Sequence, residues 1–349
     1  MLECLVIGGG QSGLLCGYLL AQAKVDYLVV DSGAAAGDVW RQRPASLRLF
    51  TSRQFCTLSD LMMPGDPDGY PSGREFADYL ELFTRTKDVR VSFATRVMKL
   101  TLSPSGFDAL LDNGETLQCR TVIDATGSNQ APIIPVFSRN LSSDVVQLSA
   151  GQFSDSEFMP HNSRVAVVGD GASGRQIAMS LAERHRVTLC CGRRRKLIAN
   201  RVLGKDVFWW LDKLGILSAR HDSLVAATLK KRDPIPVASA SNSVLALLGV
   251  DIKGRAIGAC QSELIFDDRN HVPIEAVVWC NGYRENTDWL ELPRLKEPVG
   301  SAGYEGKTAQ PGYFLMGRKW LTCRASELIL GANNDAPIII KYVQTHLGK

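Results

Sequence analysis

Two glycine-rich stretches carry residues whose types and spacing suit the binding of a nucleotide pyrophosphate. The first reads G-x-G-x-x-G, with Gly8, Gly10 and Gly13 placed between an apolar run and a segment of helical character. Gly8 permits a tight turn, Gly10 lets the backbone approach phosphates, and Gly13 lets a helix pack closely on a strand. The helix start offers free N–H groups and a positive dipole end to the phosphates. We therefore predict a dinucleotide site formed by Gly8, Gly10, Gln11, Ser12 and Gly13.

A second stretch, VAVVGDGASGRQIA at 165–178, repeats this order of apolar run, glycine turn and helix. The two units differ after their second apolar run. In the first unit that run ends at Asp31, which can accept hydrogen bonds from a ribose hydroxyl pair. In the second unit it leads into a basic cluster at 193–196, whose guanidinium groups can hold the extra phosphate of NADP. We therefore predict NADPH here, with a solvated basic turn as the alternative, and assign to this site Gly169, Gly171, Ala172, Ser173, Gly174, Arg193, Arg194 and Arg195.

Two strand-like runs that end in glycine indicate how the units are connected. VIDATG at 122–127 precedes the second glycine unit, and VVWCNGY at 277–283 follows it. The chain therefore leaves the first unit before it builds the second and returns afterwards. We place Thr126 and Gly127, at the first crossing, among the cofactor-binding residues. Two nucleotide sites in one chain indicate a resident FAD that is reduced by a transient NADPH.

This order predicts an α/β fold with two Rossmann-like dinucleotide-binding domains. An NADPH-binding domain at 161–281 is inserted into a discontinuous FAD-binding domain formed by 1–160 and 282–349. Residues 201–229 are expected to form a helical embellishment that faces the cleft. Substrate is expected to enter between the domains, near the flavin.

Composition excludes several other classes of function. The chain has 349 residues, 45% of them hydrophobic, and a net charge of +4 without a long basic block, so we expect no nucleic-acid partner. It lacks a secretory leader and a run of about 18 apolar residues, which predicts a cytoplasmic protein without a membrane span. The nine cysteines are scattered and the five histidines lack metal-ligand spacing, so buried thiols and no metal site are expected. Oligomeric state is left open.

Several stretches outside the glycine units resemble the flavin-containing monooxygenase family, most closely its bacterial CzcO-like branch and the plant YUCCA enzymes. The matching segments are GDVWRQRPASLRLFTSRQF (37–55), YPSGREFADYLELF (70–83), RVLGKDVFWWLDKLGIL (201–217) and PGYFLMGRKWLTCRASELILGANNDA (311–336). The resemblance implies that NADPH reduces FAD and that a flavin hydroperoxide, formed with O2, passes one oxygen to a small organic substrate. The protein must then orient the cofactor and exclude water.

The resemblance also implies roles for single residues. Thr51 and Ser52 are expected to approach the isoalloxazine ring as catalytic residues, and Trp320 to close over it with a helix start at 326–330. Trp209 and Trp210, by contrast, are expected to pack in the core, on an amphipathic helix. The residues expected along the FAD are Trp40, Arg48 and, through its backbone, Val97.

Several positions depart from the family pattern, among them Asp38, which takes the place of a common glycine before Trp40. Ser149, retained as a third catalytic candidate, stands where the family has histidine, Phe153 where it has tyrosine, and Ala172 where it has asparagine. The second glycine turn also carries Asp170, which raises the cost of bringing a phosphate close. Because these positions normally serve the pyridine nucleotide, the alternative function is an NADPH-dependent reductase or oxidase that transfers no oxygen.

Two further alternatives remain open. A nucleotide-binding sensor without turnover would keep both glycine units. A disulfide reductase would need a redox dithiol near the flavin, and the adjacent Cys190 and Cys191 do not suit that role, since neighbouring strand residues point to opposite faces.

Overall fold

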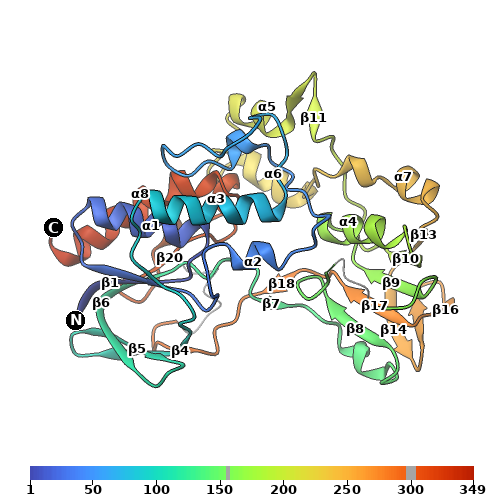
Figure 1. The fold of residues 1–349 in the computed structure, drawn as a ribbon, viewed down its shortest axis with the longest axis horizontal. Helices are drawn as coiled ribbons and strands as arrows, with labels where there is room; N and C mark the ends of the chain where they lie inside the picture. Colours follow the sequence, from blue (N-terminus) through green and yellow to red (C-terminus); the bar gives the residue numbers. More distant parts are fainter. Residues whose placement is uncertain (155–157, 296–303) are drawn as a thin grey trace.

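Two β-sheets, each built around one glycine unit, form the framework of the molecule and lie at opposite ends of it (Figure 1). The computed structural model describes residues 1–154, 158–295 and 304–349. Helices pack on the sheets, so the protein has the α/β fold that the sequence predicts. Both chain ends belong to the first lobe, where Lys349 Nζ contacts Glu3 Oε2 at 2.7 Å.

The first sheet has eight strands in the order β19-β4-β5-β6-β1-β2-β3, with β20 paired to β6. Strands β1, β2, β3 and β20 are parallel to their partners, and β4, β5 and β6 form an antiparallel meander. The residues from Cys4 to Ile7 are all buried, as expected for a parallel strand covered on both faces. The bounds are β1 Leu2–Ile7, β2 Tyr27–Val30, β3 Val91–Ser92, β4 Val97–Ser103, β5 Gly106–Leu111, β6 Thr116–Asp124, β19 Leu290–Glu291 and β20 Tyr313–Leu315.

The second sheet has five parallel strands in the order β13-β10-β9-β17-β8. They are β8 Val146–Ser149, β9 Arg164–Val168, β10 Arg186–Cys190, β13 Asp251–Lys253 and β17 Ala276–Trp279. Smaller pairings are β14 Ala256–Cys260 with β15 Glu263–Phe266 and β16 His271–Pro273, β11 Arg201–Val202 with β12 Lys205–Asp206, and β7 Ala131–Pro132 with β18 Tyr283–Arg284. The β7–β18 pair joins the two segments that cross between the sheets.

Helices α1 and α8 lie together beside the first sheet (Figure 1). Helix α3 begins with a capping box, in which Ser72 Oγ accepts from Glu75 N at 3.1 Å and the Glu75 carboxylate accepts from Ser72 N at 2.7 Å. No helix in the described part of the chain is both long and apolar enough to cross a bilayer. The α-helices are α1 Gln11–Gln22, α2 Asp38–Arg41, α3 Gly73–Thr86, α4 Ala172–Leu181, α5 Val207–Lys213, α6 Leu224–Arg232, α7 Asn242–Leu247 and α8 Gly331–Leu347, and the 3-10 helices are η1 Arg53–Phe55, η2 Val136–Asn140, η3 Ala238–Ala240, η5 Tyr304–Gly306 and η6 Arg324–Glu327.

The chain visits the sheets in the order that an insertion requires. Strands β1 to β6 build the first sheet, β8 to β17 build the second, and β19 and β20 return to the first. Strand β8 pairs with β17, Val146 opposite Ala276, although it lies within the 1–160 segment assigned to the first unit. The second sheet therefore begins before residue 160.

The segment at 201–229 contains a short β11–β12 hairpin, α5 and the start of α6, and the hairpin and α5 lie at the top of the view in Figure 1. Phe208 is buried and stacks on Phe50, with ring centroids 5.7 Å apart. Trp209 and Trp210 are only half-buried, so they do not pack in the core as expected. Phe208 is the aromatic residue of this helix that does. The reason is that α5 presents its apolar face to the first lobe and leaves the tryptophan side partly open.

Candidate functional site

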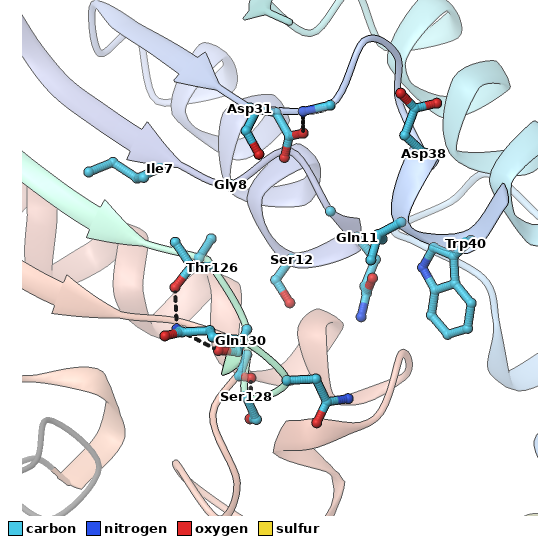
Figure 2. Close-up of a pocket in the computed structure, with 18 of the residues that line it drawn as sticks. Ile7, Gly8, Gln11, Ser12, Asp31, Asp38, Trp40, Thr126, Ser128 and Gln130 are labelled. Atoms are coloured by element: carbon cyan, nitrogen blue, oxygen red, sulfur yellow. Dashed lines mark hydrogen bonds between the residues drawn. The ribbon is translucent and has the colours of Figure 1, made fainter. Parts of the chain in front are cut away.

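A cavity of about 640 Å³ lies at the carboxyl ends of β1, β2 and β6, beside the start of α1 (Figure 2). This is the edge at which parallel sheets bind their ligands. Among the residues predicted for the first nucleotide, those that line it are Gly8, Gly10, Gln11, Ser12, Asp31, Trp40, Val97, Thr126 and Gly127.

Three glycines shape the first turn in different ways. Gly8 has a φ of +105°, and a Cβ built on it would lie 2.7 Å from Ala125 O. A Cβ on Gly13 would lie 1.8 Å from Gly8 O, so a side chain there would separate α1 from the turn. A Cβ on Gly10 would meet nothing within 4 Å. Packing thus requires glycine at positions 8 and 13, whereas position 10 leaves the backbone open toward the cavity.

Asp31 ties the glycine turn to the loop after β2. Its Oδ2 accepts from Gly9 N at 2.5 Å, and its Oδ1 accepts from Gly33 N at 2.7 Å. Each carboxylate oxygen has a further lone pair, so the group can still accept hydrogen bonds from a ligand in the cavity.

A buried ionic network holds the loop at the first crossing. Arg318, 3% exposed, donates to Asp124 Oδ2 at 2.8 Å and also to Gly127 O. Tyr313 donates to the same Asp124 oxygen at 2.8 Å. Burial, together with the neighbouring Asp124, raises the pKa of Tyr313. The network fixes Thr126, whose hydroxyl donates to Asp124 Oδ1 at 2.6 Å.

Gln130 joins the two crossing segments at the cavity wall (Figure 2). Its Nε2 donates to Thr126 Oγ1 at 2.6 Å and to Gly127 O at 2.9 Å. Its Oε1 accepts from Asn286 N at 2.6 Å. Sequence reasoning missed Gln130, Asn286 and Arg318, because their signal is a contact between segments far apart in the chain.

Trp40 borders the first cavity and carries a buried polar atom. Its ring packs edge-on against Phe76, with centroids 5.0 Å apart, and it borders the cavity (Figure 2). Its Nε1 is buried and has no hydrogen-bond partner among the described residues. A buried donor without a partner is costly, and a ligand acceptor in the cavity would satisfy it.

Besides Gly13, which packs α1 against the turn, five predicted residues lie outside the lining of this cavity. Thr51 is 3% exposed, and its Oγ1 lies 3.4 Å from Cys56 Sγ. Ser52 is fully buried, and its N–H donates to Asp206 Oδ2 at 2.7 Å. Arg48 is exposed and donates to the neighbouring Ala45 O at 3.2 Å. Each is engaged by protein groups beside it.

Ser149 and Trp320 complete this group. Ser149, at the end of β8, donates through its hydroxyl to Gln152 Oε1 at 2.8 Å. Trp320 contacts two cations, with Lys230 Nζ 4.8 Å and Arg324 Cζ 5.7 Å from its ring centroid. Residues 326–328 do line the cavity, but they belong to η6 and the turn after it, because α8 begins only at Gly331.

A second cavity, of about 910 Å³, lies beside the second glycine turn. Gly169 has a φ of +111°, and a Cβ on Gly174 would lie 1.9 Å from Gly169 O, so this turn repeats the packing of the first. Gly171 is the N-cap of α4, and Ala172 and Ser173 are its first residues. The predicted residues from this turn that do not line the cavity are Gly169, Gly171, Ala172, Ser173 and Gly174. The lining includes Asp170, Arg175, Arg194, Arg195, Lys253 and Arg255.

The cations of this cavity differ in how far they are neutralised. Arg195 contacts Asp233 Oδ2 at 3.1 Å, and Arg193, which does not line the cavity, lies 4.0 Å from the same oxygen. Arg194 and Arg255 make no ion pair within the described residues. Positive charge is therefore presented to the cavity mainly by these two side chains, of which Arg194 belongs to the basic cluster, while Arg195 contributes a charge that Asp233 partly neutralises.

Asp170 is compensated inside the protein. Its Oδ1 accepts from Gly192 N at 3.1 Å, and its Oδ2 lies 3.4 Å from Arg175 NH2. Both side chains are buried. The acid on the turn is thus paired, which reduces the repulsion expected from the sequence.

The adjacent Cys190 and Cys191 do not form a dithiol that faces one site. All nine are free thiols. Cys190 belongs to the apolar cluster on one face of the second sheet, and Cys191 packs against the cluster on the other. Burial raises the pKa of Cys191 to about 11, so this thiol is not activated. Among the described residues no group of three His, Cys, Asp or Glu side chains is poised to hold a metal.

Comparison with known proteins places the chain in a family. A family model described as pyridine nucleotide-disulphide oxidoreductase matches residues 5–205. A CzcO-like oxidoreductase of Geobacillus kaustophilus is 32% identical over 348 residues, 99% of each chain. The probable indole-3-pyruvate monooxygenase YUCCA9 of Arabidopsis thaliana is 27% identical over 82% of this chain and 76% of that protein.

A solved flavin-containing monooxygenase from Stenotrophomonas maltophilia has the same fold, with a TM-score of 0.82 over 99% of both chains at 23% identity. The resemblance to the flavin-containing monooxygenases, with their CzcO-like and YUCCA branches, is therefore confirmed. The chain belongs to the pyridine nucleotide-disulphide oxidoreductase family, and within it to the CzcO-like oxidoreductases.

Proposed function

We propose that this oxidoreductase is an FAD-containing, NADPH-dependent monooxygenase that transfers one oxygen atom of O2 to a small organic substrate. One observation carries the proposal. Two cavities lie beside two glycine turns, and the loop that follows the second strand bears a carboxylate in one unit and arginines in the other. Such a pair suits a resident flavin nucleotide and a phosphate-bearing pyridine nucleotide.

The first cavity is proposed to hold FAD. The backbone at Gly10 and the N–H groups at the start of α1 would bind the pyrophosphate. Asp31 would accept hydrogen bonds from the ribose hydroxyls. The unpartnered Trp40 Nε1 would donate to the ligand, and the Val97 backbone would border the adenine. When bound, the flavin would supply the electron transfer and oxygen chemistry that side chains lack.

The second cavity is proposed to hold NADPH. Arg194 and Arg195 would contact its extra phosphate, and the glycines of the turn would allow the pyrophosphate to approach α4. Because Asp170 is already paired with Arg175, it would add little repulsion.

We also propose that the chain comprises two Rossmann-like units, the NADPH-binding one inserted into the FAD-binding one. The pairing of β8 with β17 favours a first boundary before Val146 rather than at residue 160. The return near residue 282 agrees with the crossing at β18.

Thr51, Ser52, Ser149 and Trp320 are proposed to act through the segments that they hold. Ser52 N–H binds Asp206, and the neighbouring Phe50 stacks on Phe208. This contact belongs to the same apolar cluster as Leu328, which lines the first cavity. Exclusion of water there would favour oxygen transfer over release of peroxide.

The second candidate function is an NADPH-dependent reductase or oxidase that releases peroxide. Two observations favour it. The Ser149 hydroxyl is bound to Gln152, and Ala172 offers no side-chain amide at the start of α4.

A spectrum of the purified protein tests the cofactor, and titration with NADPH and NADH tests the reductant. The functions are then separated by mixing reduced protein with O2 in the presence of candidate amines, sulfides and ketones. The monooxygenase proposal expects oxygenated product in proportion to NADPH consumed. Complete conversion of NADPH to peroxide with every substrate would support the second candidate, and a colourless protein that binds no flavin would overturn both.

A further inference from the structure

Asp335, near the start of α8, is a buried carboxyl group without the compensation that other buried aspartates have. Its side chain is 0% exposed, and Oδ2 has no partner among the described residues. Within residues 1–154, 158–295 and 304–349, the other buried aspartates are Asp124, which pairs with Arg318, Asp170, which pairs with Arg175, and Asp206, which accepts from two backbone N–H groups. Burying an uncompensated carboxylate is costly, so a specific role is expected for it.

Two hydroxyl groups connect Asp335 to the first cavity. Thr322 Oγ1 donates to Asp335 Oδ1 and lies 3.2 Å from Ser326 Oγ. Ser326 lines the cavity, and its position is fixed because its Oγ accepts from the N–H groups of Thr322 at 3.0 Å and Cys323 at 3.1 Å. Hydroxyls both donate and accept, so this row can pass a proton between the cavity wall and the carboxyl group.

No cation on the elements packed against α8 pairs with Asp335 in the described structure. Arg324 forms an ion pair with Glu327, and Asp124 forms one with Arg318. Glu305 accepts from Tyr342. Among the side chains that the structure describes, the remaining titratable groups on these elements are Cys16 and Tyr18 on α1 and Cys119 and Arg120 on β6.

We propose that Asp335 takes up a proton when flavin in the first cavity is reduced and releases it on reoxidation. The inference rests on the flavin part of the proposed function. A hydride from the pyridine nucleotide brings two electrons and one proton to the flavin. A second proton, from solvent, forms an O–H bond on Asp335 and compensates the added negative charge. Apart from the C–H bond of the nucleotide that breaks and the bond to hydrogen that forms on the flavin in hydride transfer, no other bond would change. On reoxidation the O–H bond on Asp335 would break and its proton would return to solvent.

The energetics agree with this geometry. Burial raises the pKa of Asp335, against the opposing effect of the Thr322 and Ser326 hydroxyls. Negative charge added nearby raises the pKa of a carboxyl group further. Asp335 would thus have a lower pKa beside oxidised flavin and a higher pKa beside reduced flavin. At a pH between these two pKa values, the carboxyl group is ionised beside oxidised flavin and neutral beside reduced flavin.

The test measures the midpoint potential of the bound flavin against pH. In the native protein we expect a pH interval in which the plot of midpoint potential against pH becomes steeper, by the slope that corresponds to one additional proton per two electrons. Asp335→Asn should lose this interval, and Thr322→Val should move it to higher pH, because a donor to the carboxylate is removed. Asp60→Asn is the matched control. Asp60 pairs with Lys87 at 2.6 Å on the surface, so its loss should leave the interval in place.

Parallel plots for the native protein and Asp335→Asn at every pH would overturn the proposal while leaving the proposed function intact. Should Asp335→Asn fail to retain flavin, an unmoved interval in Thr322→Val would overturn it equally. A native protein that binds no flavin would overturn both proposals.

Discussion

Asp170 Oδ1 accepts a hydrogen bond from Gly192 N at 3.1 Å, and this bond joins the second glycine turn to the loop after β10. The first unit joins the corresponding loops with the opposite polarity, because there the turn donates through Gly9 and the acid, Asp31, follows β2. Placing the acid on the turn leaves residues 191–196 without a carboxylate. Arg194 of that loop then faces the cavity without an ion pair among the described residues, whereas Arg195 is paired with Asp233.

Arg194→Ala is expected to weaken the binding of NADPH and to leave the binding of NADH nearly unchanged. Charge-assisted hydrogen bonds contribute about 1.5–3 kcal/mol, which corresponds to a rise in the Kd or KM for NADPH of roughly 10- to 100-fold. Arg193→Ala is the control, since Arg193 is adjacent but does not line the cavity. Steady-state kinetics with both nucleotides provides the measurement. Equal effects of the two variants on NADPH would refute the assignment of the phosphate site.

Gly10→Ala and Gly13→Ala separate ligand access from packing. A methyl group on Gly13 would meet Gly8 O at 1.8 Å, so we expect a loss of about 1–3 kcal/mol in the free energy of unfolding of the flavin-free protein. Gly10 has a φ of −76° and open space around its Cβ, so alanine there should leave the flavin-free protein stable. It should instead reduce flavin retention. Denaturant unfolding and flavin content after gel filtration distinguish these effects, and a Gly10→Ala protein with undiminished flavin would contradict the proposed pyrophosphate position.

How much of the site could be predicted depends on the range over which each residue acts. The glycine turns, Asp31 and Trp40 could be predicted because a turn, a strand end or a short family segment determines where they lie. Arg318 contacts Asp124 from 194 positions along the chain, and no local pattern indicates that pair. Thr51 and Ser52 lie outside the cavity lining, and their hydrogen bonds to Cys56 and Asp206 are contacts that the family segment alone does not indicate.

The arrangement of the sheets shows the same division. Alternating strands, glycine turns and helices indicate both sheets, since each unit is local. The membership of β8 in the second sheet depends on its pairing with β17, about 130 positions later, through Val146 and Ala276. Nothing in the four residues Val146–Ser149 distinguishes the two sheets.

Trp40→Phe is expected to lower flavin affinity while preserving the fold. Phenylalanine keeps an aromatic ring against Phe76 and removes the N–H that lacks a partner in the described structure. A neutral hydrogen bond contributes about 0.5–1.5 kcal/mol, so the Kd for FAD should rise roughly 2- to 12-fold. Reconstitution of the flavin-free protein, followed by flavin fluorescence, gives this value. Unchanged affinity would place the ligand away from the indole nitrogen.

Asp335→Asn should alter how stability depends on pH even without flavin. Because the pKa of Asp335 is raised in the folded protein, the folded state binds more protons than the unfolded state above the ordinary aspartate pKa. Asp335 therefore makes the native protein lose stability as pH rises from that value to the folded pKa, by up to about 1.4 kcal/mol per pH unit. Asparagine does not titrate, so the stability of the variant relative to the native protein should increase over this interval and then level off. Urea unfolding at several pH values measures the difference. A difference that is constant across the acidic range would show that Asp335 titrates equally in both states, and the carboxyl group would then be hydrated or paired in solution.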